Sequence, residues 1–249
     1  MADANTVRRI ARLAEVGEGD RVVEIGAGLG SLTLALLETG ASVTAIEIDR
    51  RLAPVLRSVV EPAGATVVQA DALTLEWDQL LGSTGAGSWI LVANLPYNVA
   101  TPLVADLLDS VPAVGRMLVM VQKEAAERLA AAPGHPAYGA VSVKVAYWAR
   151  ARVVGRVPRT VFVPQPNVDS SLLSVLRRPA PAVDPAQVSA DRLFRVVRAG
   201  FAHRRKMLRR SLAGMVAAEA FEAAGVRPEA RAEELDVVTW GRLAAHAEG

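Results

Sequence analysis

The sequence predicts an α/β protein in which a seven-stranded, mostly parallel sheet carries helices on both faces and is followed by a small all-α domain. Short apolar runs alternate with helical patterns over the first half of the chain. A glycine-rich turn joins the first strand to the helix after it. The chain has 249 residues and is 51% hydrophobic, which allows one large core and a smaller second one.

The first half of the chain is expected to alternate between helix and strand. Residues 3–15 form the first helix, because Asp3 can cap it and apolar residues recur on one face. Strands are then expected at residues 21–25, 42–47, 66–69, 89–93 and 116–121, separated by helices at 31–38, 50–60, 101–108 and 123–131.

The second half departs from this alternation. A helix is expected at 138–148, and strands at 152–157 and 170–176 form a closing antiparallel pair. Residues 162–169 between them are too rich in proline to join a central strand. Residues 177–185 form the clearest linker, and only helices are expected beyond it, at 187–200, 205–213, 216–224 and 236–246. The expected domains are residues 1–180 and 186–249.

The composition excludes several classes of protein. The chain has no cysteine, so it has no disulfides, thiolate metal sites or cysteine nucleophiles, and its three histidines are too far apart in sequence to suggest a metal site. No apolar run reaches the ~18 residues of a membrane span, and no secretory signal is visible. These features favour a cytoplasmic protein, with a monomer as the simplest assembly.

The positive charge is concentrated in two stretches, although the net charge is only +2. Six basic residues and no acidic ones lie between residues 128 and 168, and eight basic residues and no acidic ones lie between 192 and 210. Such clustering is typical of a surface that binds a polyanion such as nucleic acid. A solvated, arginine-rich surface is the alternative.

Polar groups at the ends of three successive strands predict a nucleoside-binding site. Gly26, Gly28 and Gly30 allow a tight turn and close approach of a ligand, but their spacing is not that of a dinucleotide motif. Glu47 ends the second strand and can accept hydrogen bonds from two ribose hydroxyls. Asp71 ends the third and can accept one from an adenine amine. S-adenosylmethionine has this chemistry, with Ile48 and Ala72 as neighbouring contacts.

The tetrapeptide Asn94-Leu95-Pro96-Tyr97 follows the fourth strand and suits a flat molecule with an exocyclic amine. A ring-conjugated amine is a poor nucleophile because its lone pair is delocalised. The Asn94 amide oxygen and a backbone carbonyl, expected to be that of Pro96, would accept its two protons and direct the lone pair at a methyl group. Tyr97 can stack on the ring. The alternative is an Asn-x-Pro turn with a buried tyrosine.

Phe162 is a candidate second wall for the same ring, because prolines hold the loop around it. A phenylalanine in the hydrophobic core is an equally good interpretation of this residue.

Together these residues resemble the ribosomal RNA adenine dimethyltransferase family, most closely its small-subunit (16S) members. The resemblance covers about residues 3–245. It rests on the stretches 24–33, 45–49, 69–72, 93–98, 119–124, 162–170 and 201–208.

The resemblance implies a Rossmann-like class I methyltransferase domain that uses S-adenosylmethionine. It implies dimethylation of the exocyclic amine of two adjacent adenosines near the 3′ end of 16S rRNA in the immature small subunit. Gly26 and Gly28 would approach the methionine part of the cofactor, and Tyr97 and Phe162 would enclose the target base. The basic helical region that matches the family implies RNA-binding residues Arg204, Arg205, Lys206 and Arg209.

One departure from the family concerns the segment before Asp3. Family members usually carry a Gln-Asn-Phe-Leu-like segment there that covers the active site, and the sequence begins at Met1 without it. A ribosome-assembly factor without catalysis is therefore an alternative. A 23S rRNA adenine methyltransferase of the macrolide-resistance type is another, and a nicotinamide oxidoreductase is disfavoured by the glycine spacing.

Overall fold

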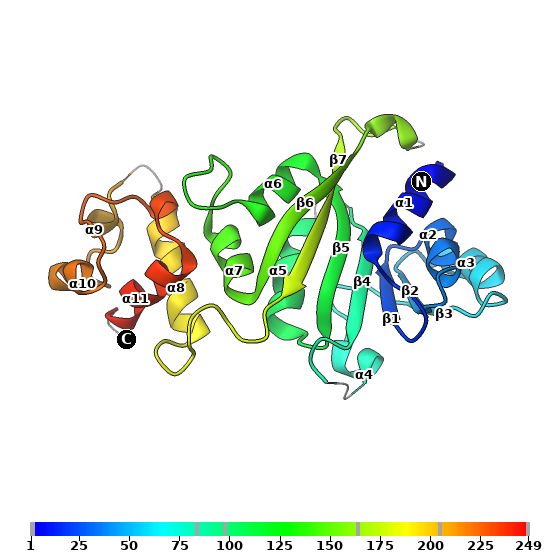
Figure 1. Cartoon of the computed structure of the whole chain (residues 1–249), viewed down its shortest axis with the longest axis horizontal. Coiled ribbons are helices and arrows are strands. Elements are labelled where there is room, and N and C mark those ends of the chain that lie inside the picture. Colours follow the sequence, from blue (N-terminus) through cyan, green and yellow to red (C-terminus); the bar gives the residue numbers. More distant parts are fainter. Residues whose placement is uncertain (1–2, 83–84, 97–98, 163–164, 204–205, 248–249) are drawn as a thin grey trace. The chain divides into compact units, whose positions relative to one another are not determined.

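The computed structural model describes residues 3–82, 85–96, 99–162, 165–203 and 206–247. Seven strands form one sheet in the order β3-β2-β1-β4-β5-β7-β6 (Figure 1). They are β1 (Arg21–Ile25), β2 (Ser42–Glu47), β3 (Thr66–Gln69), β4 (Trp89–Asn94), β5 (Val114–Gln122), β6 (Ala149–Val157) and β7 (Ser170–Arg177).

Strands β1 to β5 pair in parallel, and β7 pairs with β5 in antiparallel register. β1 lies between β2 and β4, so the strand order reverses there. In open α/β sheets such a reversal leaves a crevice at the carboxyl ends of the strands, where ligands bind. The sequence-based prediction of a seven-stranded, mostly parallel sheet is confirmed.

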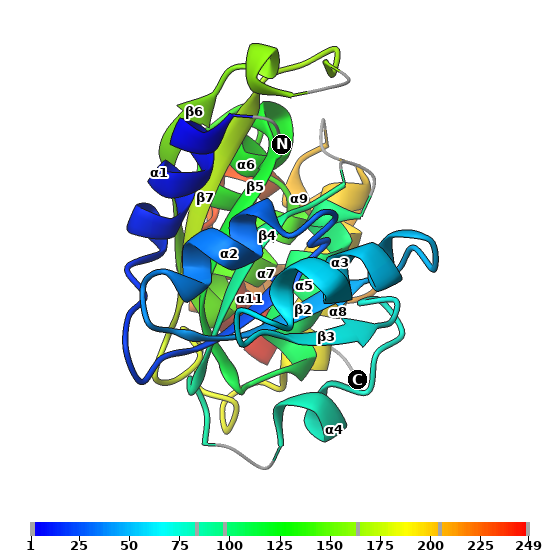
Figure 2. The same cartoon turned by 90° about the vertical axis from the view of Figure 1, so that its right-hand side faces the viewer.

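The helices of the first half of the chain are α1 (Ala4–Ala14), α2 (Ser31–Leu37), α3 (Leu52–Val60), α4 (Trp77–Leu81), α5 (Ala100–Ser110) and α6 (Lys123–Ala130). Helix α1 packs its buried face, which includes Val7 and Ile10, against α2 and the sheet. Asp3 accepts a hydrogen bond from the Thr6 backbone N–H at 2.8 Å, which confirms it as the N-cap. Figure 2 shows α1 and α2 beside each other along the sheet.

The chain divides into two compact units. The first contains residues 1–126 and 152–177, and the second contains residues 127–151 and 178–249. The contacts therefore group residues 127–151, which were expected with the first domain, with the C-terminal helices.

The second unit is almost entirely helical. Its helices are α7 (Ala140–Trp148), α8 (Ala190–Ala202), α9 (Leu208–Ser211), α10 (Ala218–Ala223) and α11 (Val237–Ala245). They surround a core that includes the fully buried Tyr147 and Trp240. The rings of Tyr147 and Phe194 meet edge to face at 5.3 Å. The Tyr138 hydroxyl donates to the Leu235 carbonyl at 2.8 Å, which ties the segment before α7 to the segment before α11.

Most element boundaries agree with the sequence patterns to within a few residues, and three features differ. Helix α4 was not expected, because its five residues are too few to show a helical period. Helix α9 is shorter than the expected 205–213. Two single turns of 3-10 helix, Arg159–Val161 and Ala232–Glu234, were also not expected. Within the described ranges, no helix is long and apolar enough to cross a bilayer.

Candidate active site

The sheet brings the predicted site residues that follow β1 to β4 together at the carboxyl ends of these strands. Ile25, the last residue of β1, is paired with Ile46 of β2 and with Ala93 of β4, and Glu47 is paired with Gln69 of β3. Because these strands are parallel, the glycine turn after β1, Glu47, the segment after β3 and Asn94 all lie at their carboxyl ends. The grouping of these polar residues follows directly from strand order.

The turn after β1 has the backbone shape that its glycines predict. Gly26 has φ +75°, and its N–H donates to the Ile46 carbonyl at 2.9 Å. A Cβ on Gly26 would lie 3.5 Å from the Asn94 carbonyl oxygen, beside the cavity. Gly30 has a different role, because a Cβ there would lie 2.4 Å from a methyl group of Val60. Gly30 therefore permits helix packing, whereas at Gly26 it is the positive φ that favours glycine.

Glu47 is held in place by backbone donors at both of its carboxylate oxygens. Gly28 N–H donates to Oε2 at 2.8 Å and Asp49 N–H donates to Oε1 at 2.9 Å. The residue is buried, so its orientation is fixed by these two bonds. A carboxylate oxygen can accept more than one hydrogen bond, so each oxygen retains capacity for a ligand hydroxyl.

Two cavities meet at Gly26. The first, of about 250 Å³, is lined by the turn residues 26–29 and by Glu24, Ser31, Leu32 and Asn94. The second, of about 230 Å³, is lined by Asp71, Ala72, Pro96 and mostly apolar side chains. Gly26 lines both. The pair therefore offers a polar compartment next to an apolar one.

The apolar compartment contains the other predicted cofactor contacts. Ile48, Asp71 and Ala72 all line it. The Asp71 carboxylate accepts from the Leu73 N–H through Oδ1 at 2.9 Å, and within the described residues Oδ2 accepts no hydrogen bond. This leaves an acceptor at the rim of an apolar cavity, a suitable contact for the amine of a flat ring.

Three large apolar side chains around the two cavities are unusually exposed. Leu29, Ile48 and Leu73 have exposed fractions of 61%, 59% and 50%, and each lines one of the cavities. Apolar side chains clustered around a cavity are typical of a surface that a ligand covers.

The backbone carbonyls of the loop after β4 differ in whether they already accept hydrogen bonds. Asn94 lies half-buried at the first cavity. The Pro96 carbonyl, expected to accept a substrate proton, already accepts the Val99 and Ala100 N–H groups at 3.2 and 3.1 Å and starts α5. The expectation for Pro96 is therefore wrong on geometric grounds. The Leu95 carbonyl accepts no hydrogen bond from any described residue, so it is the better candidate acceptor.

The Leu95 side chain itself faces the core. It is 1% exposed, and its N–H donates to the Met120 carbonyl at 3.0 Å. Leu95 therefore anchors the loop to β5 and can offer a ligand only its backbone oxygen. Tyr97 lies outside the described residues.

Phe162 follows the 3-10 turn Arg159–Val161 and is partly buried against the core that α1 and α2 share with the sheet. It lines neither cavity. This position fits the core interpretation, and its proposed contact with a base stays a prediction.

Glu24 is a site residue that the motif analysis did not single out. It is 2% exposed in the middle of the sheet, lines the first cavity and accepts from the Thr33 hydroxyl at 2.6 Å. Burial, and to a smaller extent the charge of Glu47, raises its pKa to about 7, against the opposing effect of the Thr33 hydrogen bond. The sequence signal that could have identified it is an acidic residue among the apolar residues of the strand at 21–25.

The predicted RNA-binding residues lie in the second unit. Lys206 and Arg209 are exposed, the latter on α9, and Arg204 and Arg205 lie outside the described residues. Within the described part of the chain, no group of three histidine, aspartate or glutamate residues could hold a metal ion.

Comparisons with known proteins identify similar sequences over almost the whole chain. The family model for "Ribosomal RNA adenine dimethylase" matches residues 1–247. A "Ribosomal RNA small subunit methyltransferase A" from Cutibacterium acnes is 52% identical over 254 residues, covering 97% of this chain and 84% of that protein. The protein of the same name from Streptomyces coelicolor is 49% identical, with coverage of 98% and 87%.

Solved structures show the same fold. The dimethyladenosine transferase from Plasmodium falciparum has a TM-score of 0.82 and 23% identity, covering 98% of this chain and 95% of that one. The 23S rRNA methyltransferase ErmE has a TM-score of 0.76 and 27% identity, with coverage of 97% and 96%.

Proposed function

Because the chain belongs to the ribosomal RNA adenine dimethylase family, we propose that it transfers methyl groups from S-adenosylmethionine to the exocyclic amines of two adjacent adenosines near the 3′ end of 16S rRNA. One observation carries the proposal. A polar and an apolar cavity meet at Gly26, and the loop after β4 contributes Asn94 to the first and Pro96 to the second. A nucleoside with a charged tail fits such a pair of cavities.

The chain's own residues fit the cofactor in its two parts. Gly26 and Gly28 leave room for the methionine part, with the Glu24 carboxylate available to its ammonium group. Glu47 would accept from the ribose hydroxyls. Asp71 would accept from the adenine amine, whose ring Ile48 and Ala72 would contact. When bound, the cofactor supplies an electrophilic methyl group on a sulfonium.

The loop after β4 would hold the amine that is methylated. The Asn94 amide oxygen and the Leu95 carbonyl accept hydrogen bonds from its two N–H groups. These bonds concentrate the lone pair on nitrogen and aim it into the site. This combines positioning with electrostatic stabilisation. No general base is needed before attack, because the proton leaves only after the nitrogen has become cationic. Tyr97 and Phe162 would enclose the ring.

The substrate is proposed to be rRNA within the immature small subunit, bound by a monomeric protein in the cytoplasm. The small-subunit assignment is supported by identity, because the two bacterial relatives above are 52% and 49% identical whereas the 23S rRNA methyltransferase is 27% identical. Residues 1–180 would carry the chemistry. Residues 186–249, with Arg204, Arg205, Lys206 and Arg209, would bind RNA.

The test is methyl transfer from labelled S-adenosylmethionine to immature 30S subunits and to immature 50S subunits, with the modified nucleotides mapped. We expect two adjacent dimethylated adenosines in 16S rRNA only. Label in 23S rRNA would support the macrolide-resistance type. Subunit binding without label in either RNA would support an assembly factor without catalysis.

A further inference from the structure

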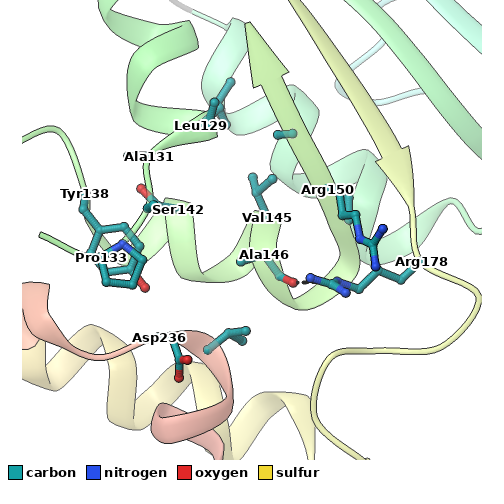
Figure 3. A pocket seen from close by; sticks show the side chains of 15 residues that line it. Leu129, Ala131, Pro133, Tyr138, Ser142, Val145, Ala146, Arg150, Arg178 and Asp236 are labelled. Atoms are coloured by element: carbon teal, nitrogen blue, oxygen red, sulfur yellow. Dashed lines mark hydrogen bonds between the residues drawn. The ribbon is translucent and has the colours of Figure 1, made fainter. Parts of the chain in front are cut away.

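A third cavity, of about 210 Å³, is lined only by residues of the second unit, and none of them is assigned to a site above (Figure 3). Its lining is dominated by small apolar groups, including Ala131, Ala146 and Ala149. It is smaller than the ~300–1,000 Å³ of a typical ligand pocket, so it has room for about one flat ring and not for a larger ligand.

Two guanidinium groups lie together on one side of this cavity. The Arg178 N–H donates to the Trp148 carbonyl at 2.8 Å, which places the start of the Arg178 side chain beside Arg150. The Arg178 Nε donates to the Ala146 carbonyl at 3.0 Å. Figure 3 shows both side chains at the same side of the cavity.

Within the described part of the chain, no carboxylate pairs with Arg150 or Arg178, and the terminal nitrogens of both lack hydrogen-bond partners. Two adjacent cations repel each other, and their planar donors match the oxygens of a phosphate. The two side chains are therefore suited to contact an anion.

The other side of the cavity carries acceptors. Asp236 lies there, across from the two arginines in Figure 3. Its Oδ1 accepts from the Thr239 N–H at 2.7 Å as the N-cap of α11. Its carboxylate disfavours a second negative group at this side but can accept a hydrogen bond from an amine or a hydroxyl.

We propose that this cavity binds one nucleotide of the RNA substrate, with its phosphate on Arg150 and Arg178 and its base on the alanine-lined floor. Asp236 accepts from the base amine or the ribose. The proposal rests on the proposed function for the source of the nucleotide. It adds a contact for RNA that is separate from the methyl-transfer site.

The first test measures the RNA affinity of the Arg150→Gln variant at salt concentrations from about 50 to about 200 mM. Loss of one phosphate contact should change the slope of log affinity against log salt concentration by about 1. We expect a shallower slope by about 1 and a several-fold weaker affinity at about 0.1 M salt. The matched control is Arg231→Gln, which removes an exposed charge from the same unit outside this cavity. Equal effects in both variants would overturn the proposal.

A second variant separates a nucleotide pocket from a charged surface. Ala131→Phe fills the floor without changing charge, so it should weaken RNA binding while thermal unfolding stays cooperative. Ala131→Val serves the same purpose if the larger residue prevents folding. Unchanged affinity in the variant that folds would exclude insertion of a base.

Two further measurements identify the source of the ligand. AMP should compete with RNA only weakly. If Arg150→Gln weakens saturable AMP binding but leaves RNA affinity unchanged, the cavity is a site for a free nucleotide instead. A wild-type protein that methylates no RNA would refute the proposed function. The RNA affinities of the Arg150→Gln and Arg231→Gln variants would still test whether the cavity binds RNA.

Discussion

At the scale of single residues, Glu24 has the most unusual environment in the site, because it is a buried carboxyl group whose pKa is raised to about 7. The same carboxyl in the unfolded chain titrates near 4.5. Between these values the folded protein binds the proton more tightly than the unfolded chain. The contribution of Glu24 to stability is therefore complete below about pH 4.5 and is lost as the pH rises through 7.

Glu24→Gln should remove this loss. At pH 8 we expect the variant to be more stable than the wild type by about 2–3 kcal/mol, and near pH 4.5 the difference should shrink toward zero. Urea unfolding of both proteins at several pH values between 4.5 and 8 measures it. A difference independent of pH would contradict the raised pKa.

Asn94 should matter for chemistry and little for folding. It lies half-buried at the cavity, and its side chain makes no hydrogen bond with any described residue. Asn94→Ala is expected to lower kcat by about 100-fold or more and to change the free energy of unfolding by less than about 0.5 kcal/mol. Single-turnover methylation and thermal unfolding check the two parts, and Asn94→Asp provides an isosteric control. A large loss of stability would make Asn94 a structural residue.

At the scale of elements, Arg177 joins the end of β7 to the end of α5. Its guanidinium donates to four backbone carbonyls at 2.8–3.1 Å, those of Leu107, Leu108, Val111 and Val114. The last turn of a helix has carbonyls without partners in the helix, and a cation there is favoured by the helix dipole. Arg177 satisfies them from a neighbouring strand.

Arg177→Ala should lower the free energy of unfolding by about 3 kcal/mol, because it leaves several partly buried carbonyls without donors. Arg177→Lys should recover only part of this, since an ammonium cannot reach four acceptors from one plane. Arg57→Ala is the control. Arg57 forms an exposed i,i+4 pair with Glu61 at 2.8 Å, and its loss should cost less than about 0.5 kcal/mol. Equal effects of Arg177→Ala and Arg57→Ala would refute the role of Arg177.

The elements that could be predicted from the sequence are those with strong periodicity or a clear terminal signal. The parallel strands show as apolar runs, and their carboxyl ends place Glu47, Asp71 and Asn94 together without knowledge of the packing. The hydrogen bonds of the Pro96 carbonyl could not be foreseen, because they depend on where α5 begins. Helix α4 is too short to produce a pattern.

The division into two units could not be predicted from sequence patterns either. Residues 127–151 belong with residues 178–249 because Tyr138, Val143 and Tyr147 complete a core whose other members are distant in sequence. The sequence of α7 is apolar almost all round, so it shows neither which side of the helix is buried nor which distant helix covers it.

At the scale of the whole molecule, the second unit consists of two separate stretches of the chain, and this predicts which fragments can fold. A fragment of residues 186–249 lacks Tyr138, Val143 and Tyr147, so its remaining apolar side chains lose the partners that bury them. We expect this fragment to lack cooperative thermal unfolding and a sharp NMR spectrum. A fusion of residues 127–151 to residues 178–249 through a flexible linker should recover both. Cooperative unfolding of the shorter fragment would contradict the contact between α7 and the C-terminal helices.

Binding of RNA is the second property of the whole molecule. Lys206 and Arg209 are exposed in the second unit, and neutralising both should reduce the magnitude of the salt slope of RNA binding by about 2. Filter binding at several salt concentrations measures the slope. A control that neutralises Arg50 and Arg51, two exposed residues at the start of α3, should leave the slope nearly unchanged. An unchanged slope in the Lys206/Arg209 variant would remove these residues from the interface.

The second unit consists of two separate stretches of the chain, so a ribosome synthesises its parts at different times. Helix α7 leaves the exit tunnel before β6 and β7, and it precedes α8 and α11, which complete its core, by dozens of residues. During that interval Val143 and Tyr147 have no apolar surface of their own unit to cover them. The sheet can close once Arg177 has emerged, whereas α7 must wait for the C-terminal helices. Nascent chains that stall between these two points would therefore expose α7, the segment on which a chaperone would be expected to act.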